Sequence, residues 1–499
     1  MGNNPGKMMI YAPYAIWGPH FETDLELARR HLESGGEVIF LYCTGELLTC
    51  FPNQDHRRSV CRLCISRFRK GMDWLGTTNV TVKNFYHITS EQQNEIERLK
   101  TQDLGSSEDL RNCTLQGADI GVAALSSVIS LLREPKPDTA KYGSLIRNNL
   151  ISAAHVFFSL YNHLQVERPE RLVIFNGRYA QLRPALSAAR IIGIEVLVHE
   201  RAGVLNRFSL MTNTTPHDLK SIQEEMLRIS KNFVGTNDSK IRTACEWFEE
   251  RRKNVTQGWE SFTTQQKQGQ LPELSINRNN LVIFISSEDE MEAFEDWRSP
   301  IYIDQNDGIR QLLSDKRIID KFKIFVREHP NLAGIDNSQT RLLRELAVEF
   351  GDSFCLIHAD SPISTYSLID ASDGILTFGS TVGVEAVYRN KPSFLMGRAY
   401  YEHLGCCVSP DSHNELVEKL LAFADGDRSM LPADQACHNA VITYGLFNKE
   451  WGHLFRYAKV MDLRTVLMKR AGKFTRLRPS LLSWLLYQAE RLLYFGRKP

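Results

Sequence analysis

Residues 373–396 read Asp373-Gly-Ile-Leu-Thr-Phe378-Gly379-Ser-Thr-Val-Gly-Val-Glu385-Ala-Val-Tyr-Arg-Asn-Lys-Pro-Ser-Phe-Leu-Met396. A short apolar run ends at a glycine turn, a segment with helical spacing follows, and Asn-Lys-Pro precedes a second apolar run. Strand, turn, helix and return strand form the repeating unit of a parallel α/β sheet. Such sheets bind ligands at the carboxyl ends of their strands, which is where Gly379 lies.

The first half of the chain carries the same pattern. The run Arg171-Leu-Val-Ile-Phe-Asn176-Gly177-Arg178 precedes a predicted helix over 185–192 and a strand over 194–198. The chain also begins with a predicted strand, helix and strand. One such element in each half predicts an α/β protein with two Rossmann-type domains.

The domain boundaries follow from composition. Residues from about 90 to 167 are helical in pattern and predict an insertion in the first domain, whereas residues 256–280 are polar and aperiodic, as expected of a linker. We therefore predict domains over 1–265 and 280–440, followed by a crossover segment and a basic amphipathic helical tail over 441–499.

The overall composition is typical of a soluble globular protein. The 499 residues carry a net charge of +1, with 42% hydrophobic and 24% charged residues. A balanced charge argues against a nucleic-acid partner. No apolar run approaches the roughly 20 residues of a membrane-spanning helix, so we expect a cytoplasmic protein.

Polar groups follow three predicted strands of the second domain. After the strand at 374–377, Ser380 and Thr381 begin a helix and suit a phosphate or ribose, with Glu385 on the same helix face. The other candidate ligand residues are Gly379, Gly383, Arg327, His329, Pro330, Ser286, Ser287 and Glu290. The alternative is that these are ordinary helix caps and loop residues.

Four motifs carry a family resemblance: Ser286-Ser-Glu-Asp-Glu290, Arg327-Glu-His-Pro-Asn331, Ser364-Thr-Tyr-Ser-Leu-Ile369 and Phe378-Gly-Ser-Thr-Val-Gly-Val-Glu-Ala386. Over about residues 280–410 the chain resembles the capsule and surface polysaccharide biosynthesis glycosyltransferases, including the capsular Kdo transferases. The resemblance implies a GT-B fold, in which two Rossmann-type domains face a cleft and the second binds the donor nucleotide.

The resemblance also implies roles. His329, Ser380 and Thr381 would contact the donor phosphate, and Glu385 would hold the ribose. The expected reaction transfers a sugar from a CMP-, UDP- or GDP-linked donor to a capsular polysaccharide or a lipid-linked glycan. Enzymes of this fold generally need no catalytic metal.

The first domain would bind the acceptor. We predict that Glu200 is the general base on the acceptor hydroxyl, and that Arg178 or Arg201 binds an acidic acceptor or offsets the charge of the leaving group. His20 and Glu22 at the first loop are rival candidates, and Asn176 and Gly177 lie with Arg178 at a strand end. The alternative to these catalytic and acceptor-binding roles is a structural ion pair between Arg and Glu across adjacent loops.

Four cysteines crowd one segment of the first domain. Cys43, Cys50, Cys61 and Cys64 include one Cys-x-x-Cys pair. In a reducing compartment this spacing is typical of a structural zinc site, and four unrelated thiols are the alternative.

The tail is basic and apolar. Residues 480–495 have one broad apolar face, and basic residues surround them: Arg464, Lys469, Arg470, Lys473, Arg476, Arg478, Arg491, Arg497 and Lys498, opposed only by Glu490. Such a helix suits an anionic membrane surface, so we expect peripheral binding at the inner membrane face. The alternative is a helix packed back on the first domain.

Two other functions share the expected fold. A nucleotide-sugar 2-epimerase carries a Ser-Gly-Gly turn followed by paired acids, whereas this chain has Gly379-Ser380-Thr381 and a single Glu385. A non-catalytic partner in a polysaccharide assembly complex would not need an intact set of polar residues.

Overall fold

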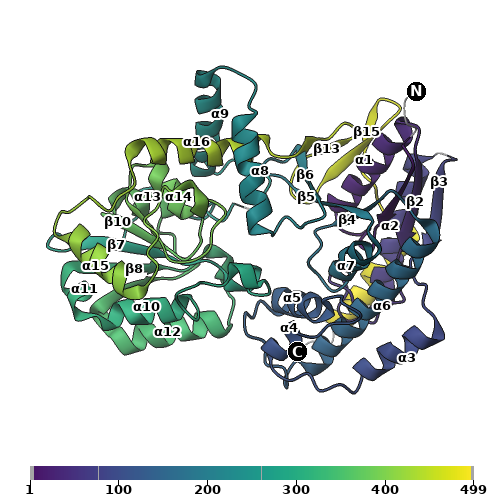
Figure 1. Cartoon of the computed structure of the whole chain (residues 1–499), viewed down its shortest axis with the longest axis horizontal. Coiled ribbons are helices and arrows are strands. Elements are labelled where there is room, and N and C mark those ends of the chain that lie inside the picture. The colour runs from purple at the N-terminus through teal and green to yellow at the C-terminus, as the bar shows by residue number, and fades with distance from the viewer. Residues whose placement is uncertain (1–4, 77, 260, 496–499) are drawn as a thin grey trace. The chain divides into compact units, whose positions relative to one another are not determined.

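The computed structural model describes residues 5–76, 78–259 and 261–495, which form two compact units (Figure 1). Unit 1 contains Met1–Leu132, Lys136–His217 and Gly452–Pro499, and unit 2 contains Arg133–Pro135 and Asp218–Trp451. Each unit is built on a mainly parallel sheet, so the prediction of an α/β protein with two Rossmann-like domains is confirmed.

Unit 1 is built on a seven-stranded sheet of order β12-β6-β5-β4-β1-β2-β3. Strands β3, β2, β1, β4 and β5 are parallel, and β6 is antiparallel to β5 and β12. The strands are β1 Lys7–Tyr11, β2 Glu37–Tyr42, β3 Val80–Asn84, β4 Arg171–Phe175, β5 Glu195–Arg201, β6 Arg207–Thr212 and β12 His453–Leu454.

Helices cover both faces of this sheet. Along β1, Met8 and Ile10 point to one core, and Met9 and Tyr11 point to the other, because strand side chains alternate. The helices are α1 His20–Glu33, α2 Arg58–Leu75, α3 Ser90–Leu99, α4 Ser107–Arg111, α5 Ile120–Leu132, α6 Gly143–Glu167 and α7 Arg183–Ile192.

The last part of the chain returns to unit 1. An antiparallel sheet of β13 Ala458–Val460, β14 Val466–Arg470 and β15 Lys473–Thr475 precedes helix α17 Leu481–Phe495. The predicted helical tail thus contains three short strands, and Val466 and Met468 of β14 pack into the same core as β1. Arg497 and Lys498 lie outside the described residues.

Unit 2 is built on a parallel five-stranded sheet of order β11-β10-β7-β8-β9. Its strands are β7 Asn279–Phe284, β8 Phe322–Arg327, β9 Phe354–Ile357, β10 Gly374–Thr377 and β11 Ser393–Leu395. Its helices are α8 Leu219–Lys231, α9 Asn237–Arg252, α10 Gln305–Ser314, α11 Lys316–Lys321, α12 Ser338–Phe350, α13 Thr365–Ala371, α14 Val382–Tyr388, α15 His413–Ala424 and α16 Asp434–Glu450.

The boundary between the units differs from the predicted linker at 256–280. The chain enters unit 2 at Asp218, because α8 and α9 pack against α16. Ala244 of α9 is fully buried against Ile442 and Leu446 of α16. Sequence periodicity reveals that a helix is amphipathic but not which unit buries its apolar face.

Candidate functional site

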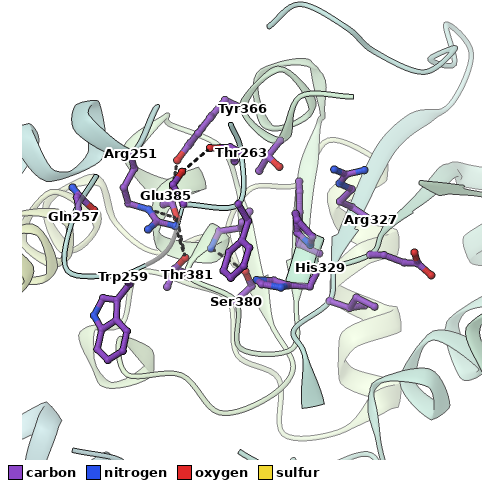
Figure 2. Close-up of a pocket in the computed structure, with 18 of the residues that line it drawn as sticks. Arg251, Gln257, Trp259, Thr263, Arg327, His329, Tyr366, Ser380, Thr381 and Glu385 are labelled. Atoms are coloured by element: carbon purple, nitrogen blue, oxygen red, sulfur yellow. Dashed lines mark hydrogen bonds and ion pairs between the residues drawn. The ribbon is translucent and has the colours of Figure 1, made fainter. Parts of the chain in front are cut away.

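A pocket of about 690 Å³, counting the part open to solvent, lies at the carboxyl ends of β7, β8 and β10 (Figure 2). The chain runs from β7 outward to β8 and β9, and then crosses to β10 on the other side of β7. This reversal of strand order leaves a crevice at the strand ends, which is where open α/β sheets bind ligands.

Glu385 on α14 is the centre of a hydrogen-bond network in this pocket. Its Oε1 accepts bonds from Thr381 Oγ1 at 2.9 Å and from Arg251 Nε at 3.2 Å. Its Oε2 accepts a bond from the Tyr366 hydroxyl at 2.7 Å (Figure 2). Only 3% of Glu385 is exposed, so this network fixes the carboxylate at the pocket wall.

Arg251 on α9 supplies the positive charge of this network. Burial is the largest influence and opposes the charge, but Glu385, Tyr366 and Tyr444 together outweigh it and raise the pKa of Arg251 above its usual value. The guanidinium also lies over the Trp247 ring, 5.0 Å from its centroid. Arg251 is therefore held as a cation between a carboxylate and an aromatic face.

His329 follows β8 and lines the same pocket. Its Nδ1 accepts a hydrogen bond from the backbone N–H of Asn331 at 3.2 Å. Burial and the nearby Arg133 and Arg251 lower the pKa of His329 to about 4. The ring is therefore neutral at pH 7 and carries its proton on Nε2, so it can donate one hydrogen bond from that atom.

Arg327 and Pro330 flank His329. The Arg327 guanidinium is 1% exposed and donates to the backbone carbonyls of His358 at 2.6 Å and Ser361 at 3.2 Å. Burial lowers its pKa to about 10, which still leaves it charged at pH 7. Arg327 thus orders the loop after β9 and keeps a positive charge behind the pocket.

The glycine turn after β10 brings Ser380 into the pocket. Gly379 has φ +132°, and a Cβ there would collide with the carbonyl oxygen of Arg398. A Cβ on Gly383 would collide with the hydroxyl of Tyr401, which donates to Ser380 O at 2.6 Å. The two glycines therefore permit the turn and its packing, and Ser380 and Thr381 are the residues that line the pocket.

The predicted contacts Ser286, Ser287 and Glu290 are not among the residues that line this pocket. Ser287 and Asp289 both bind Arg133, a residue of the segment that crosses from α5. Glu290 accepts a bond from Asn331 Nδ2 at 2.8 Å. Ser287 and Asp289 thus bind each other and Arg133, Glu290 binds the loop that carries His329, and the backbone of Ser286 binds the side chains of Gln305 and Gln339.

Several pocket residues were missing from the sequence prediction, among them Arg251, Trp259 and Phe262. Phe262 packs edge-on against His329 with ring centroids 5.2 Å apart, and Trp259 is 48% exposed. All three come from the segment assigned to the first domain and its linker. The sequence signal for this part of the pocket is the presence of two aromatic residues, Trp259 and Phe262, in an otherwise polar and aperiodic stretch.

A second polar cluster lies in unit 1, at the carboxyl ends of β4 and β5 and the start of α1. Glu200 accepts hydrogen bonds from Asn176 Nδ2 at 2.7 Å and from the Arg201 backbone N–H at 2.9 Å. Its Oε1 lies 3.8 Å from His20 Nδ1. Strand order reverses between β1 and β4, so this cluster also lies at a ligand-binding position of its sheet.

Both titratable side chains of this cluster are buried. Burial raises the pKa of Glu200, and the bonds from Asn176 and Arg201 only partly oppose this. Burial, Arg201 and His199 hold the pKa of His20 well below its usual value. Neutral His20 therefore lies beside a carboxylate of raised basicity.

The other candidates of unit 1 have separate partners. Glu22 is fully buried and forms an ion pair with Arg67 of α2, so the structure makes it a core residue. Arg178 donates to Ser130 and lies over the Tyr179 ring. Arg201 donates to the backbone carbonyl of Leu463 at 2.7 Å, and Gly177 has φ +74° at the turn after β4.

The predicted zinc site is absent: among the described residues, no group of three or more His, Cys, Asp or Glu side chains could hold a metal ion. Cys43 donates to Glu46, Cys61 accepts from Asn53 Nδ2 at 3.3 Å, and Cys64 contacts Pro13 O at 3.8 Å. Burial raises the pKa of Cys43 to about 12 and that of Cys64 to about 11, and it also raises the pKa of Cys50 and Cys61. The thiols also raise one another's pKa, but they do not form a group that could hold a metal ion in the described part of the chain.

We therefore expect no structural zinc in the purified protein. A chelator should leave the melting temperature unchanged, since no metal contributes to folding. Elemental analysis should give far less than one zinc per chain. One tightly held zinc per chain, lost on Cys61→Ser together with Cys64→Ser, would contradict this expectation.

The family match lies within unit 2. Residues 302–426 match the family described as capsule polysaccharide biosynthesis protein. The match includes the motifs at His329, Tyr366 and Glu385, and it confirms the predicted resemblance over this segment. A search of curated proteins finds no match.

Solved structures align with low identity. The beta Kdo 2,4 transferase KpsC of Thermosulfurimonas dismutans is 13% identical over 64% of this chain and 87% of that chain, with a TM-score of 0.33. The beta Kdo 2,7 transferase KpsC of that organism is 15% identical over 66% and 89%, with a TM-score of 0.34. The UDP-GlcNAc 2-epimerase of Neisseria meningitidis bound to UDP-GlcNAc is 12% identical over 89% and 97%, with a TM-score of 0.27.

Proposed function

We propose that the chain is a glycosyltransferase of the GT-B type, which transfers a sugar from a nucleotide-sugar donor to a capsular or other surface polysaccharide or to a lipid-linked glycan. The observation that carries the proposal is the polar pocket of unit 2. It lies at the switch point of a parallel sheet, and most of its motifs fall in the segment that matches the capsule polysaccharide biosynthesis family.

The pocket offers groups for each part of a nucleotide. The Nε2–H of His329 and the hydroxyl of Ser380 can donate to phosphate oxygens. Oε1 of Glu385 is occupied by Thr381 and Arg251, whereas Oε2 accepts one bond, from Tyr366, and has a second acceptor position for a ribose hydroxyl. Trp259 and Phe262 offer aromatic faces for a base.

Residues of this chain can stabilise the negative charge of the leaving phosphate. Arg327 is a buried cation behind His329, and hydrogen bonds to a charged group are stronger in a site that excludes water. Because Nδ1 of the neutral His329 ring accepts from the Asn331 backbone N–H, the ring presents its Nε2–H as a donor to a phosphate oxygen. The proposed reaction therefore needs no metal to offset the leaving group.

Glu200 is the proposed general base on the acceptor. A carboxylate with a raised pKa accepts a proton more readily than one with the usual value, and Asn176 and Arg201 hold this one in a single orientation. Asn176, His20 and Arg178 would bind or orient the acceptor beside it.

A thermal-shift screen tests the donor site. We expect one of CMP, CDP, UDP and GDP to raise the melting temperature of the purified chain, because a ligand that binds only the folded state stabilises it. Failure of all four nucleotides and their sugar conjugates to shift the melting temperature would contradict the proposed function.

Replacement of His329 by alanine should weaken that nucleotide about tenfold to a hundredfold, since a hydrogen bond to a charged group contributes about 1.5–3 kcal/mol. Titration calorimetry measures the change. His358→Ala is the matched control, because this histidine follows the neighbouring strand β9 with a side chain that is 60% exposed. Equal affinity for wild type and His329→Ala would contradict the assignment.

A further inference from the structure

Helix α17 packs on unit 1 through its polar side. The backbone N–H of Ser480, just before the helix, donates to Ser66 Oγ of α2 at 2.7 Å. One helix length later, Glu490 Oε2 accepts from the backbone N–H of Ser59 of α2 at 3.2 Å. The two helices are thus antiparallel neighbours, and the serine and glutamate side of α17 faces the protein.

The apolar side of α17 faces solvent. Leu481, Leu482, Leu485 and Leu492 are 71%, 68%, 49% and 75% exposed. Spacings of three, four and seven residues put these leucines on one face of a helix. Trp484 and Leu486 beside them are 46% and 38% exposed.

This arrangement is the reverse of an ordinary surface helix, which buries its apolar stripe against the core and exposes its polar residues. A contiguous group of exposed leucines and a tryptophan marks a surface that is covered by another apolar medium or partner. The leucine face of α17 is therefore a docking surface.

The charge of the neighbouring segments indicates what covers the leucine face. Helix α2, on which α17 packs, and residues 469–478, which bind α2 through the backbone carbonyls of Lys469 and Leu477, expose a series of basic side chains: Arg58, Arg62, Arg69, Lys469, Arg470, Lys473, Arg476 and Arg478. Between Asp55 and Asp73 the sequence has no acidic residue, and Glu490 is held by Ser59. A second copy of the chain would bring the same positive charge against this one, which opposes self-association.

We propose that the leucine face of α17 and the surrounding basic residues bind the surface of an anionic lipid bilayer. The leucines and Trp484 enter the boundary between headgroups and acyl chains, and the arginines and lysines contact the acidic headgroups. None of the helices in the described part of the chain is long and apolar enough to cross a bilayer. Helix α17 accordingly lies in the plane of the surface.

Vesicle co-sedimentation of the full chain tests this proposal. We expect binding to phosphatidylcholine vesicles that contain phosphatidylglycerol, weaker binding in high salt, and little binding to phosphatidylcholine alone. Leu485→Asp with Leu492→Asp should lower the partition coefficient roughly a hundredfold or more. Arg62→Glu with Arg69→Glu should lower it roughly tenfold or more.

Val234→Asp with Ile276→Asp is the control, because these side chains are 94% and 96% exposed in unit 2 and should leave vesicle binding unchanged. All of the variants replace exposed residues, so an unchanged melting temperature confirms that each one folds. No binding to acidic vesicles, or binding that survives the leucine variants, would overturn the proposal. Dimerisation without lipid that is lost in the leucine variants would overturn it in favour of a second copy.

Discussion

Replacement of Arg251 by alanine is expected to lower the free energy of unfolding by about 3 kcal/mol, at the lower end for breaking a buried ion pair. In unit 2 this corresponds to roughly 6–12 °C in melting temperature. Glu385 would keep its bonds from Thr381 and Tyr366 but would lose its only cationic partner among the residues that the structure describes. Its side chain, 4% exposed, would then carry a buried negative charge without a counter-charge.

Calorimetry of Arg251→Ala beside Arg252→Ala measures this effect. Arg252 is the next residue of α9 and has a similar exposure (36%, against 30% for Arg251), but its partner Asp370 is 37% exposed and 4.0 Å away, so its removal should change stability by less than about 1 kcal/mol. The double variant Arg251→Ala/Glu385→Ala should lose less than the sum of the single variants, because neither charge is left alone. Equal losses for Arg251→Ala and Arg252→Ala would contradict the described network.

Replacement of Glu200 by glutamine is expected to lower kcat about a hundredfold to ten-thousandfold, the range for removal of a general base. Glutamine keeps the size of the side chain and one carbonyl acceptor for Asn176 or Arg201, but it cannot take a proton from the acceptor. The KM for the donor should change little, because Glu200 lies in unit 1 and the donor pocket in unit 2.

The variant Glu22→Gln tests whether Glu22, the rival candidate, is the general base. Glu22 is fully buried in an ion pair with Arg67, so the variant should lose stability while the folded protein keeps its kcat. Loss of turnover in Glu22→Gln, with normal turnover in Glu200→Gln, would assign the base to Glu22 instead.

Sequence reasoning worked best where structure and function are local. The strands that end near Phe284, Arg327 and Thr377 were predicted from short apolar runs and glycine turns, and their ends meet because the sheet is parallel. His329 and Ser380 were found for the same reason. Both directly follow strands, so their approach to one pocket required no knowledge of long-range packing.

The missed features depend on contacts between distant segments. Arg251 lies in a helix 134 residues from Glu385, and the sequence contains no sign that these two charges pair. The cysteine spacing indicated zinc, but Asn53, Glu46 and Pro13 each contact a different thiol. The leucine face of α17 was visible as a pattern, whereas its exposure depends on which side packs against α2.

A crystal structure of the chain with the nucleotide that gives the largest thermal shift tests the central claim most directly. We expect the phosphate within hydrogen-bond distance of His329 Nε2 and Ser380, and the ribose beside Glu385. A nucleotide bound elsewhere, with the unit 2 pocket empty, would contradict the account.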